Sequence, residues 1–151
     1  MQVIISIAGR GSTFYLARQL VKRGYLERLI TSYPKFEVKK YGIPPELVRS
    51  ILIKEALERG WRKMPNFLKG FWSPQYLIHK MSDRLTLKKL KPADILWVWT
   101  SFGLDTIRKA KKMGITTIVE LGNAPMPYQD KILREEYERW GIKPELGQLT
   151  H

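Results

Sequence analysis

Residues 3 to 24 hold the feature that most restricts the possible folds, because an apolar run, a turn with two glycines and a helical pattern follow one another directly. The run from Val3 to Ala8 is rich in β-branched residues with little alternation, which is typical of a strand buried on both faces of a parallel sheet. From Phe14 to Val21, apolar residues recur every three or four positions, which predicts a helix that lies on that sheet. The stretch therefore predicts a strand, a tight loop and a helix.

The loop between this strand and this helix is a candidate anion site. Ser12 or Thr13 is expected to cap the helix, whose first N–H groups and positive dipole end favour phosphate above other anions. The dinucleotide pattern is incomplete, since Phe14 stands in place of the third glycine and no G-K-[ST] follows. We expect phosphate binding by Gly9, Gly11, Ser12 and Thr13. The alternative is that the two glycines only allow a sharp turn.

The rest of the chain continues the alternation of strands and helices. Further strands are expected at 26–31, 95–100 and 115–121, and further helices at 46–59, 74–87, 104–112 and 128–140. Residues 35 to 45 are expected to form a loop, and Gly60 is expected to stop the helix before it. This order predicts a single α/β domain over residues 1–151, a three-layer, Rossmann-like fold with an open, mainly parallel sheet.

Missing residue types exclude several classes of chemistry. The chain has no cysteine and only two histidines, His79 and His151, so a disulfide framework, a cysteine nucleophile and a histidine-rich or thiolate metal cluster are excluded. We expect no metal and no cofactor. No window has the length of a transmembrane span and no cleavable leader opens the chain, so we expect a cytoplasmic protein.

Positive charge is the unusual property of the composition. Lys and Arg number 27 against 14 Asp and Glu, a net charge of +13 that favours anionic partners. Residues 59 to 91 contribute nine cations against Asp83 alone, with aromatic residues between them. Three interpretations stay open for this segment: an anionic membrane surface, nucleic acid, or a solvated face over an ordinary core. For the first two we expect contacts from Trp61, Arg62, Lys63, Phe71 and Trp72.

The carboxyl ends of the predicted strands bring three loops together, at 9–13, 100–103 and 120–129, and ligands bind at this edge of such sheets. Glu120 is the main candidate there, because a carboxylate can accept a hydrogen bond from a ligand hydroxyl or act as a base. It is alternatively a structural acid that caps the next loop. Asn123 and Gln129 are expected to hydrogen-bond a ligand. Thr100 and Ser101 are expected to line the same opening, or only to turn the chain.

Several segments together resemble a known family. They read FYLARQLVKRGYLERLITSYP, then KYGIPPELV, then PADILWVWTSFGLDTIRKAKKMGITTIVELGNAPMPYQDKILREEYERWGI. From Phe14 to Ile142 the chain resembles the N-terminal domain of GT-B fold, family-4-type glycosyltransferases. The sharpest similarity is the family's glutamate, short polar loop, glutamine and L-x-E-E-Y helix, found here as Glu120, the loop to Met126, Gln129, and Leu133 to Tyr137.

The resemblance implies transfer of a sugar, with retention and without a metal, from a nucleotide-sugar to the hydroxyl of a sugar or lipid-linked acceptor. It implies that this domain shapes the acceptor side, that its glycine loop approaches the donor diphosphate, and that it docks peripherally at the inner face of a membrane. The family's usual Arg-Gly-Ser and histidine after the glutamate are replaced by residues 121–126, LGNAPM. The 151 residues leave no room for the donor-binding domain, so we expect activity to require one in the same polypeptide or in a partner. The alternative is a non-catalytic basic domain that binds nucleic acid or another polyanion.

Overall fold

The structure is a computed structural model that describes residues 1–8, 12–63, 75–100, 103–122 and 124–143. It divides into two compact units, Met1–Glu120 and Leu121–His151. The first unit contains the sheet and all but one of the described helices. The second contains the helix α7 (Met126–Trp140).

Five parallel strands form one open sheet in the order β3-β2-β1-β4-β5. Their bounds are Val3–Ile7 for β1, Leu26–Thr31 for β2, Val48–Ser50 for β3, Ile95–Trp99 for β4 and Thr116–Glu120 for β5. The central strand β1 pairs Val3 with Leu26 on one side and with Ile95 on the other, and Ile95 pairs with Thr116. The amino ends of four strands are therefore aligned at one edge of the sheet.

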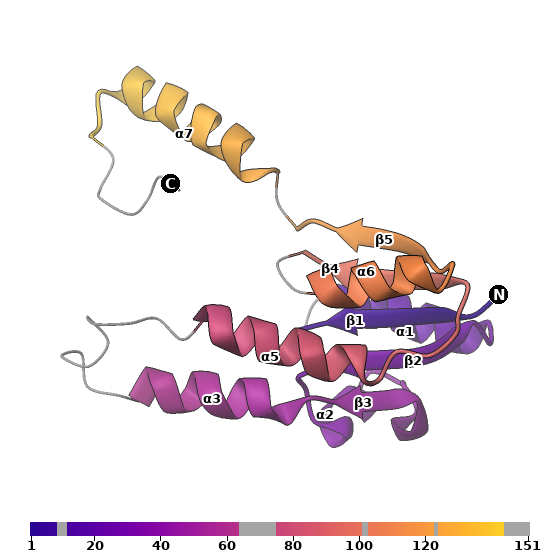
Figure 1. Cartoon of the computed structure of the whole chain (residues 1–151). Helices are drawn as coiled ribbons and strands as arrows, with labels where there is room; N and C mark the ends of the chain where they lie inside the picture. Colours follow the sequence, from indigo (N-terminus) through magenta and orange to yellow (C-terminus); the bar gives the residue numbers. More distant parts are fainter. Residues whose placement is uncertain (9–11, 64–74, 101–102, 123, 144–151) are drawn as a thin grey trace. The chain divides into compact units, whose positions relative to one another are not determined.

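Helices cover both faces of this sheet. In Figure 1, α5 and α6 lie in front of the sheet and α1 lies behind it. The first-unit helices are α1 (Thr13–Lys22), α2 (Lys35–Lys39), the short 3-10 helix η1 (Pro45–Leu47), α3 (Leu52–Lys63), α5 (Gln75–Leu87) and α6 (Leu104–Lys112). The expected three-layer, Rossmann-like α/β fold with a parallel sheet is confirmed.

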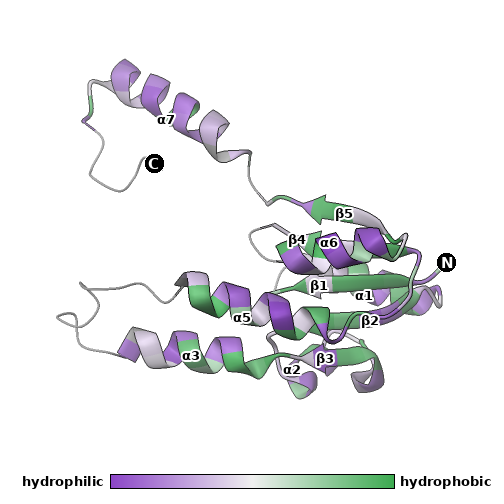
Figure 2. Ribbon diagram, viewed as in Figure 1, coloured by the Kyte–Doolittle hydropathy of each residue, from purple (hydrophilic) through white to green (hydrophobic). Residues whose placement is uncertain are grey.

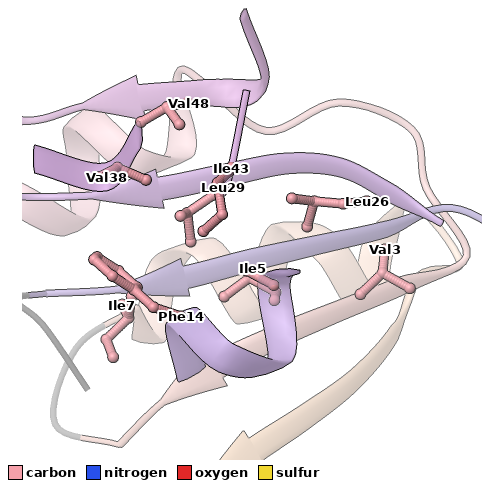
Figure 3. Packing of buried hydrophobic residues seen from close by; sticks show 10 residues of the cluster. Val3, Ile5, Ile7, Phe14, Leu26, Leu29, Val38, Ile43 and Val48 are labelled. Atoms are coloured by element: carbon pink, nitrogen blue, oxygen red, sulfur yellow. The ribbon is translucent and has the colours of Figure 1, made fainter. Parts of the chain in front are cut away.

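Two hydrophobic clusters, one on each face, explain why β1 is apolar without alternation. Val3, Ile5 and Ile7 point into the cluster beneath α1 and α2, whereas Ile4 points into the cluster beneath α5 and α6. Figure 3 shows the first cluster, and Figure 2 shows hydrophobic residues concentrated in the strands. The second cluster comprises Ile4, Ile30, Ile51, Leu96, Val98, Ala110 and Ile115.

Phe14 anchors α1 to the sheet. Its side chain is fully buried, and its ring makes edge-to-face contacts with Tyr33 and Tyr41, at centroid distances of 6.1 and 5.1 Å. Burial of such a ring contributes about 1.5–3 kcal/mol, and edge-to-face pairing adds to it. The predicted apolar stripe of this helix is confirmed.

The segment between β2 and α3 differs from its prediction. In place of one helix over 46–59, η1 is followed by the edge strand β3, and α3 begins only at Leu52. Val48 to Ser50 pair with Leu29 to Thr31, so the open edge of β2 competes successfully with the helical pattern. Two further expectations are wrong: α2 lies within the expected loop, and α3 continues through Gly60 to Lys63.

The apolar pattern over 74–87 predicts that Tyr76 or Leu77, Met81, Leu85 and Leu87 face the core, but helix α5 presents a different face. Ile78, Ser82 and Thr86 are buried, whereas Leu77 and Met81 are exposed. Leu85 packs against the core as expected. A polar interaction determines which face is buried, because this face also holds Asp83, whose carboxylate accepts hydrogen bonds from the first turn of α6. Among the described helices, none has both the length and the apolar composition required to cross a bilayer.

Candidate functional site

The site lies where the strand order reverses. The chain runs from β1 outward to β2 and β3, then returns to β4 on the other side of β1, so the carboxyl ends of β1 and β4 form a topological switch point. Open α/β sheets bind ligands at such a switch point. Ala8 follows β1 and Thr100 follows β4 at this position. The predicted site residues Gly9, Gly11 and Ser101 fall in segments that the structure does not describe.

Glu120 is held by two hydrogen bonds at this edge. Thr13 Oγ1 donates to Glu120 Oε2 at 3.2 Å, and Trp97 Nε1 donates to the same oxygen at 2.8 Å. Among the described residues, Glu120 Oε1 accepts no hydrogen bond, so one carboxylate oxygen is fixed and the other is left for a ligand. The structure thus brings together Glu120, predicted from the sequence, and Thr13, predicted from the glycine loop.

Neighbouring strands determine where these groups point. Trp99 pairs with Glu120 in the β4–β5 register, and Trp97, two residues earlier on β4, lies on the same face. Both indoles are half-buried against the cluster beneath α1. Trp97 was not predicted as a site residue. Only its place three residues before the end of a predicted strand pointed to this role.

Thr13 has a role other than the expected helix cap. Ser12 occupies the N-cap position of α1, as one of the two predicted alternatives, but its side chain makes no cap hydrogen bond. Thr13 is buried, and its hydroxyl donates across the sheet edge to Glu120 instead. A hydrogen bond from a hydroxyl to an ionised carboxylate is stronger than one to a neutral acceptor.

Thr100 and a groove extend the site onto the face of α5 and α6. Thr100 N donates to Glu120 O at 2.9 Å, which prolongs the β4–β5 ladder. The groove has a volume of about 620 Å³, within the range of ligand pockets. Its walls combine apolar side chains with cationic tips from Lys80 and Arg108. The lining side chains include Tyr76, Lys80, Thr100, Leu104, Arg108 and Val119.

Asp83 borders the same groove, but its carboxylate has a structural role. Its carboxylate accepts hydrogen bonds from Asp105 N at 2.7 Å, Thr106 N at 3.1 Å and Thr106 Oγ1 at 2.5 Å. It therefore caps the N-terminus of α6 from a different helix. Gly103 precedes α6 with φ of 97°, and an added Cβ would lie 3.0 Å from Val98 Cγ1. The sequence held one sign of this role, since Asp83 is the single acid in the strongly basic segment 59–91.

His79 also borders the groove, and its surroundings favour the neutral imidazole. Burial lowers its pKa below the ordinary 6.5, nearby Lys54 lowers it further, and Glu58 opposes both effects. Lys54 and Glu58 form an ion pair at 2.7 Å on α3. His79 therefore offers this groove a neutral hydrogen-bonding group at pH 7 rather than a positive charge.

A small cavity of about 20 Å³ lies beneath the ends of β1 and β2, lined in part by Ser6, Thr31 and Ser82. Ser82 Oγ is buried without a hydrogen-bond partner in the described part of the chain. A cavity of this size has room for one water molecule, which would hydrogen-bond this hydroxyl.

The remaining predicted site residues belong to other parts of the chain. Gln129 belongs to the second unit, where Nε2 donates to Ala124 O, and Asn123 is not described. Of the five residues expected to contact a membrane or polyanion, Lys63 is exposed and Trp61 is half-buried. The side chain of Arg62 and the whole of Phe71 and Trp72 lie outside the described structure.

Comparison with protein-family models, curated proteins and solved structures finds no match for this chain. In the described part of the chain, no three His, Asp or Glu side chains gather in a way that would hold a metal ion. Function is therefore inferred from the fold and from the groups at the sheet edge.

Proposed function

We propose that this chain is the acceptor-side domain of a retaining glycosyltransferase of the GT-B type. One observation carries the assignment: a carboxylate at the end of β5 is oriented by Thr13 from the start of α1 and by Trp97 from β4. This arrangement lies at the switch point of a Rossmann-like sheet, where such folds bind ligands. The similarity of the Glu120 to Tyr137 segment to that family supports the same assignment.

The proposed chemistry is transfer of a sugar from a nucleotide-sugar to an acceptor hydroxyl. The bond between the anomeric carbon and the diphosphate oxygen breaks, a bond to the acceptor oxygen forms on the same face, and nucleoside diphosphate and a proton are released. Glu120 accepts a hydrogen bond from the acceptor hydroxyl and orients its oxygen. The N-terminus of α1, with no side-chain cap, faces the donor diphosphate.

Catalysis on this scheme needs a donor-binding domain, in the same polypeptide or in a partner, because one half of a cleft cannot surround both reactants and exclude water. The expected peripheral attachment to the inner membrane surface through residues 59–91 stays a proposal. Residues 64–74 of that segment lie outside the described structure.

Ligand-observed saturation-transfer NMR with the full chain tests the assignment, using a panel of free sugars, polyols and nucleoside diphosphates. We expect weak binding of a hydroxyl-rich compound, and at least a tenfold loss in Glu120→Gln. Hydrogen bonds to charged groups contribute about 1.5–3 kcal/mol, which corresponds to about tenfold or more in affinity. Thr13→Val is expected to weaken the same compound less, since it only releases the carboxylate.

Glu46→Gln is the matched control, because Glu46 is exposed and lies away from this edge. Equal binding by Glu120→Gln and Glu46→Gln would show that Glu120 does not contact the acceptor. If the wild-type chain transferred saturation to none of the hydroxyl-rich compounds, the acceptor-side assignment would be wrong.

A further inference from the structure

The amino edge of the sheet, opposite the candidate site, carries a dense group of cations. They lie in the last turns of α1 and α6 or directly after α1 and α5, in each case before β2, β4 or β5. We call them the amino-edge cluster: Lys22, Arg23, Lys88, Lys89, Lys91, Lys109, Lys111 and Lys112. All but the half-buried Lys89 are exposed.

Backbone hydrogen bonds show that the three turns lie side by side. Val3 N donates to Tyr25 O at 2.8 Å, which ties the turn after α1 to β1. Asp94 N donates to Gln2 O at 2.9 Å, and Thr116 N donates to Asp94 O at 3.0 Å, which ties the turns before β4 and β5 to the same end of β1. The cluster is therefore one surface assembled from distant parts of the sequence.

Strand spacing sets the width of this surface. The strands β2, β1, β4 and β5 are separated by three gaps of about 4.8 Å, or about 14 Å in all. The Debye length at physiological ionic strength is about 8 Å. Neighbouring turns thus lie within the screening distance of one another, so the eight charges act together on a nearby anionic surface.

Within the described part of the chain, no acid neutralises these cations. None of the eight forms an ion pair with another described residue. Two acids lie at this edge, Glu27 and Asp94, and Asp94 faces the amino terminus at 3.8 Å. The helix dipole favours a cation at the C-terminal end of each helix. It does not explain why three such ends at one edge carry eight cations.

We propose that the amino-edge cluster docks on an anionic phospholipid surface. Seven of its members are Lys and one is Arg, whereas nucleic-acid recognition favours the planar Arg fork and stacking aromatics. Exposed side chains suited to the lipid interface lie at the same edge: Met1, Tyr25 and Met113 are 61%, 38% and 39% exposed. Docking through this edge does not depend on the transferase assignment.

This mode of docking orients the molecule. Strands of five residues such as β1 and β4 span about 17 Å, so Glu120 and the groove lie at the far end of the sheet from the lipid. A reactant at the candidate site therefore approaches from the water. This differs from docking through residues 61–72, which the sequence suggested.

Co-sedimentation with vesicles tests the docking surface. The full chain is mixed with vesicles of phosphatidylcholine alone or with about 30 mol % phosphatidylserine, at salt concentrations of about 0.1 and 0.5 M. We expect binding only to the anionic vesicles, with loss at high salt. The triple variant Lys109→Gln, Lys111→Gln, Lys112→Gln is expected to bind about 100-fold more weakly, at about fivefold per lysine.

The matched control removes the same charge elsewhere in the first unit, with Arg18→Gln, Lys35→Gln and Lys39→Gln, all exposed positions. The control is expected to retain binding within a few-fold. Equal losses in both triple variants would show that net charge, not this edge, attracts the lipid, and equal binding to neutral vesicles would remove the electrostatic basis. Binding of a duplex DNA that is weakened by the amino-edge variant, without vesicle binding, would reassign the surface to nucleic acid and overturn the lipid assignment.

Discussion

Asp83 and Glu120, both at the carboxyl edge of the sheet, differ in the number of hydrogen bonds that their carboxylates accept. Asp83 accepts three hydrogen bonds from α6 through both of its oxygens. Glu120 accepts two through a single oxygen. A carboxylate saturated by protein donors has a structural role, whereas one with an oxygen that no described residue occupies has capacity for a ligand.

At the same scale, Arg28 carries a buried charge that stabilises the turn after α5. Arg28 Nη1 donates to Lys89 O at 2.6 Å, and burial lowers the pKa of its guanidinium, with Arg49 adding to this and Glu27 opposing it. We expect Arg28→Met to lower the free energy of unfolding by about 1.5–3 kcal/mol, the contribution of a hydrogen bond to a charged group. Urea denaturation measures the change.

Arg23→Met is the control for Arg28→Met, because Arg23 is exposed and makes no ion pair with a described residue. Its free energy of unfolding is expected to stay within about 0.5 kcal/mol of the wild type. A similar result for Arg28→Met would show that the bond to Lys89 contributes little.

His79 predicts a pH dependence of stability. Its folded pKa is lowered from 6.5, mainly by burial and then by Lys54, whereas the unfolded chain keeps the ordinary value. As the pH falls below about 6.5, the unfolded state binds a proton before the folded state does, so stability decreases until the folded pKa is passed, by at most about 1.4 kcal/mol per pH unit. Above this window the stabilisation is complete.

Urea titrations of wild type and His79→Gln between pH 7.5 and 5, a range around the ordinary histidine value of about 6.5, measure this effect. The wild type is expected to lose more stability than the variant on acidification. Carboxylates titrate in both proteins, so the difference between the two curves isolates His79. Parallel curves would contradict a lowered pKa.

Sequence reasoning found Glu120 and Thr13 because position along the chain was sufficient to predict them. A polar residue that ends a strand, or that follows a glycine loop, lies at the carboxyl edge once the sheet is parallel. The roles of Trp97 and Asp83 were not predicted, because both depend on contacts between distant segments. Trp97 and Glu120 are 23 residues apart, and Asp83 and Asp105 are 22 residues apart. No local pattern encodes such contacts.

At the scale of elements, α5 and α6 are joined by the Asp83 cap. Removal of a carboxylate cap costs about 0.5–2 kcal/mol, and here the lost acceptor also leaves the buried Thr106 hydroxyl without its 2.5 Å partner. We expect Asp83→Ala to lower the free energy of unfolding by about 2–3 kcal/mol. Amide hydrogen exchange is expected to show faster exchange in the first turn of α6 in particular.

Asp105→Asn is the matched control within the same helix turn. Asp105 is partly exposed and lies 3.7 Å from Arg108, a surface pair whose contribution is about 0–1 kcal/mol. If Asp83→Ala and Asp105→Asn changed stability equally, the effect would come from charge near the helix end rather than from the cap.

Elements that follow strong periodicity were predictable, and those that depend on a neighbour were not. The strands β1, β2, β4 and β5 and the helices α1 and α6 lie within a residue or two of their expected bounds. β3 was missed because its three residues form a strand only through pairing with β2. Such a short segment carries too little pattern of its own to outweigh the flanking helical signal.

At the scale of the whole molecule, the core of the described chain lies within Met1–Glu120. Its last buried hydrophobic residue is Ile115, and both core clusters belong to this unit. We expect a chain ending at Gly122 to unfold in one cooperative transition, with a free energy close to that of the full chain. Phe14→Ala is expected to cost about 3–5 kcal/mol in both chains, as for a buried aromatic ring.

Urea denaturation followed by circular dichroism compares the four proteins. A gradual transition in the shortened chain, or a Phe14→Ala cost that differs between the two lengths, would show that residues beyond 122 stabilise the core. At this scale the alternation of strands and helices predicted the fold class, because it leaves few ways to arrange a parallel sheet.

The bond between Trp97 and Glu120 also makes the candidate site observable. An indole N–H can only donate, and this one donates to the carboxylate at 2.8 Å. A ligand that hydrogen-bonds the other oxygen of Glu120 changes the environment of that single proton, so its NMR resonance, one among those of five tryptophans, reports occupancy without any attached probe. The same indole adds a fluorescence signal, which lets unknown compounds be screened before any reaction has been assayed.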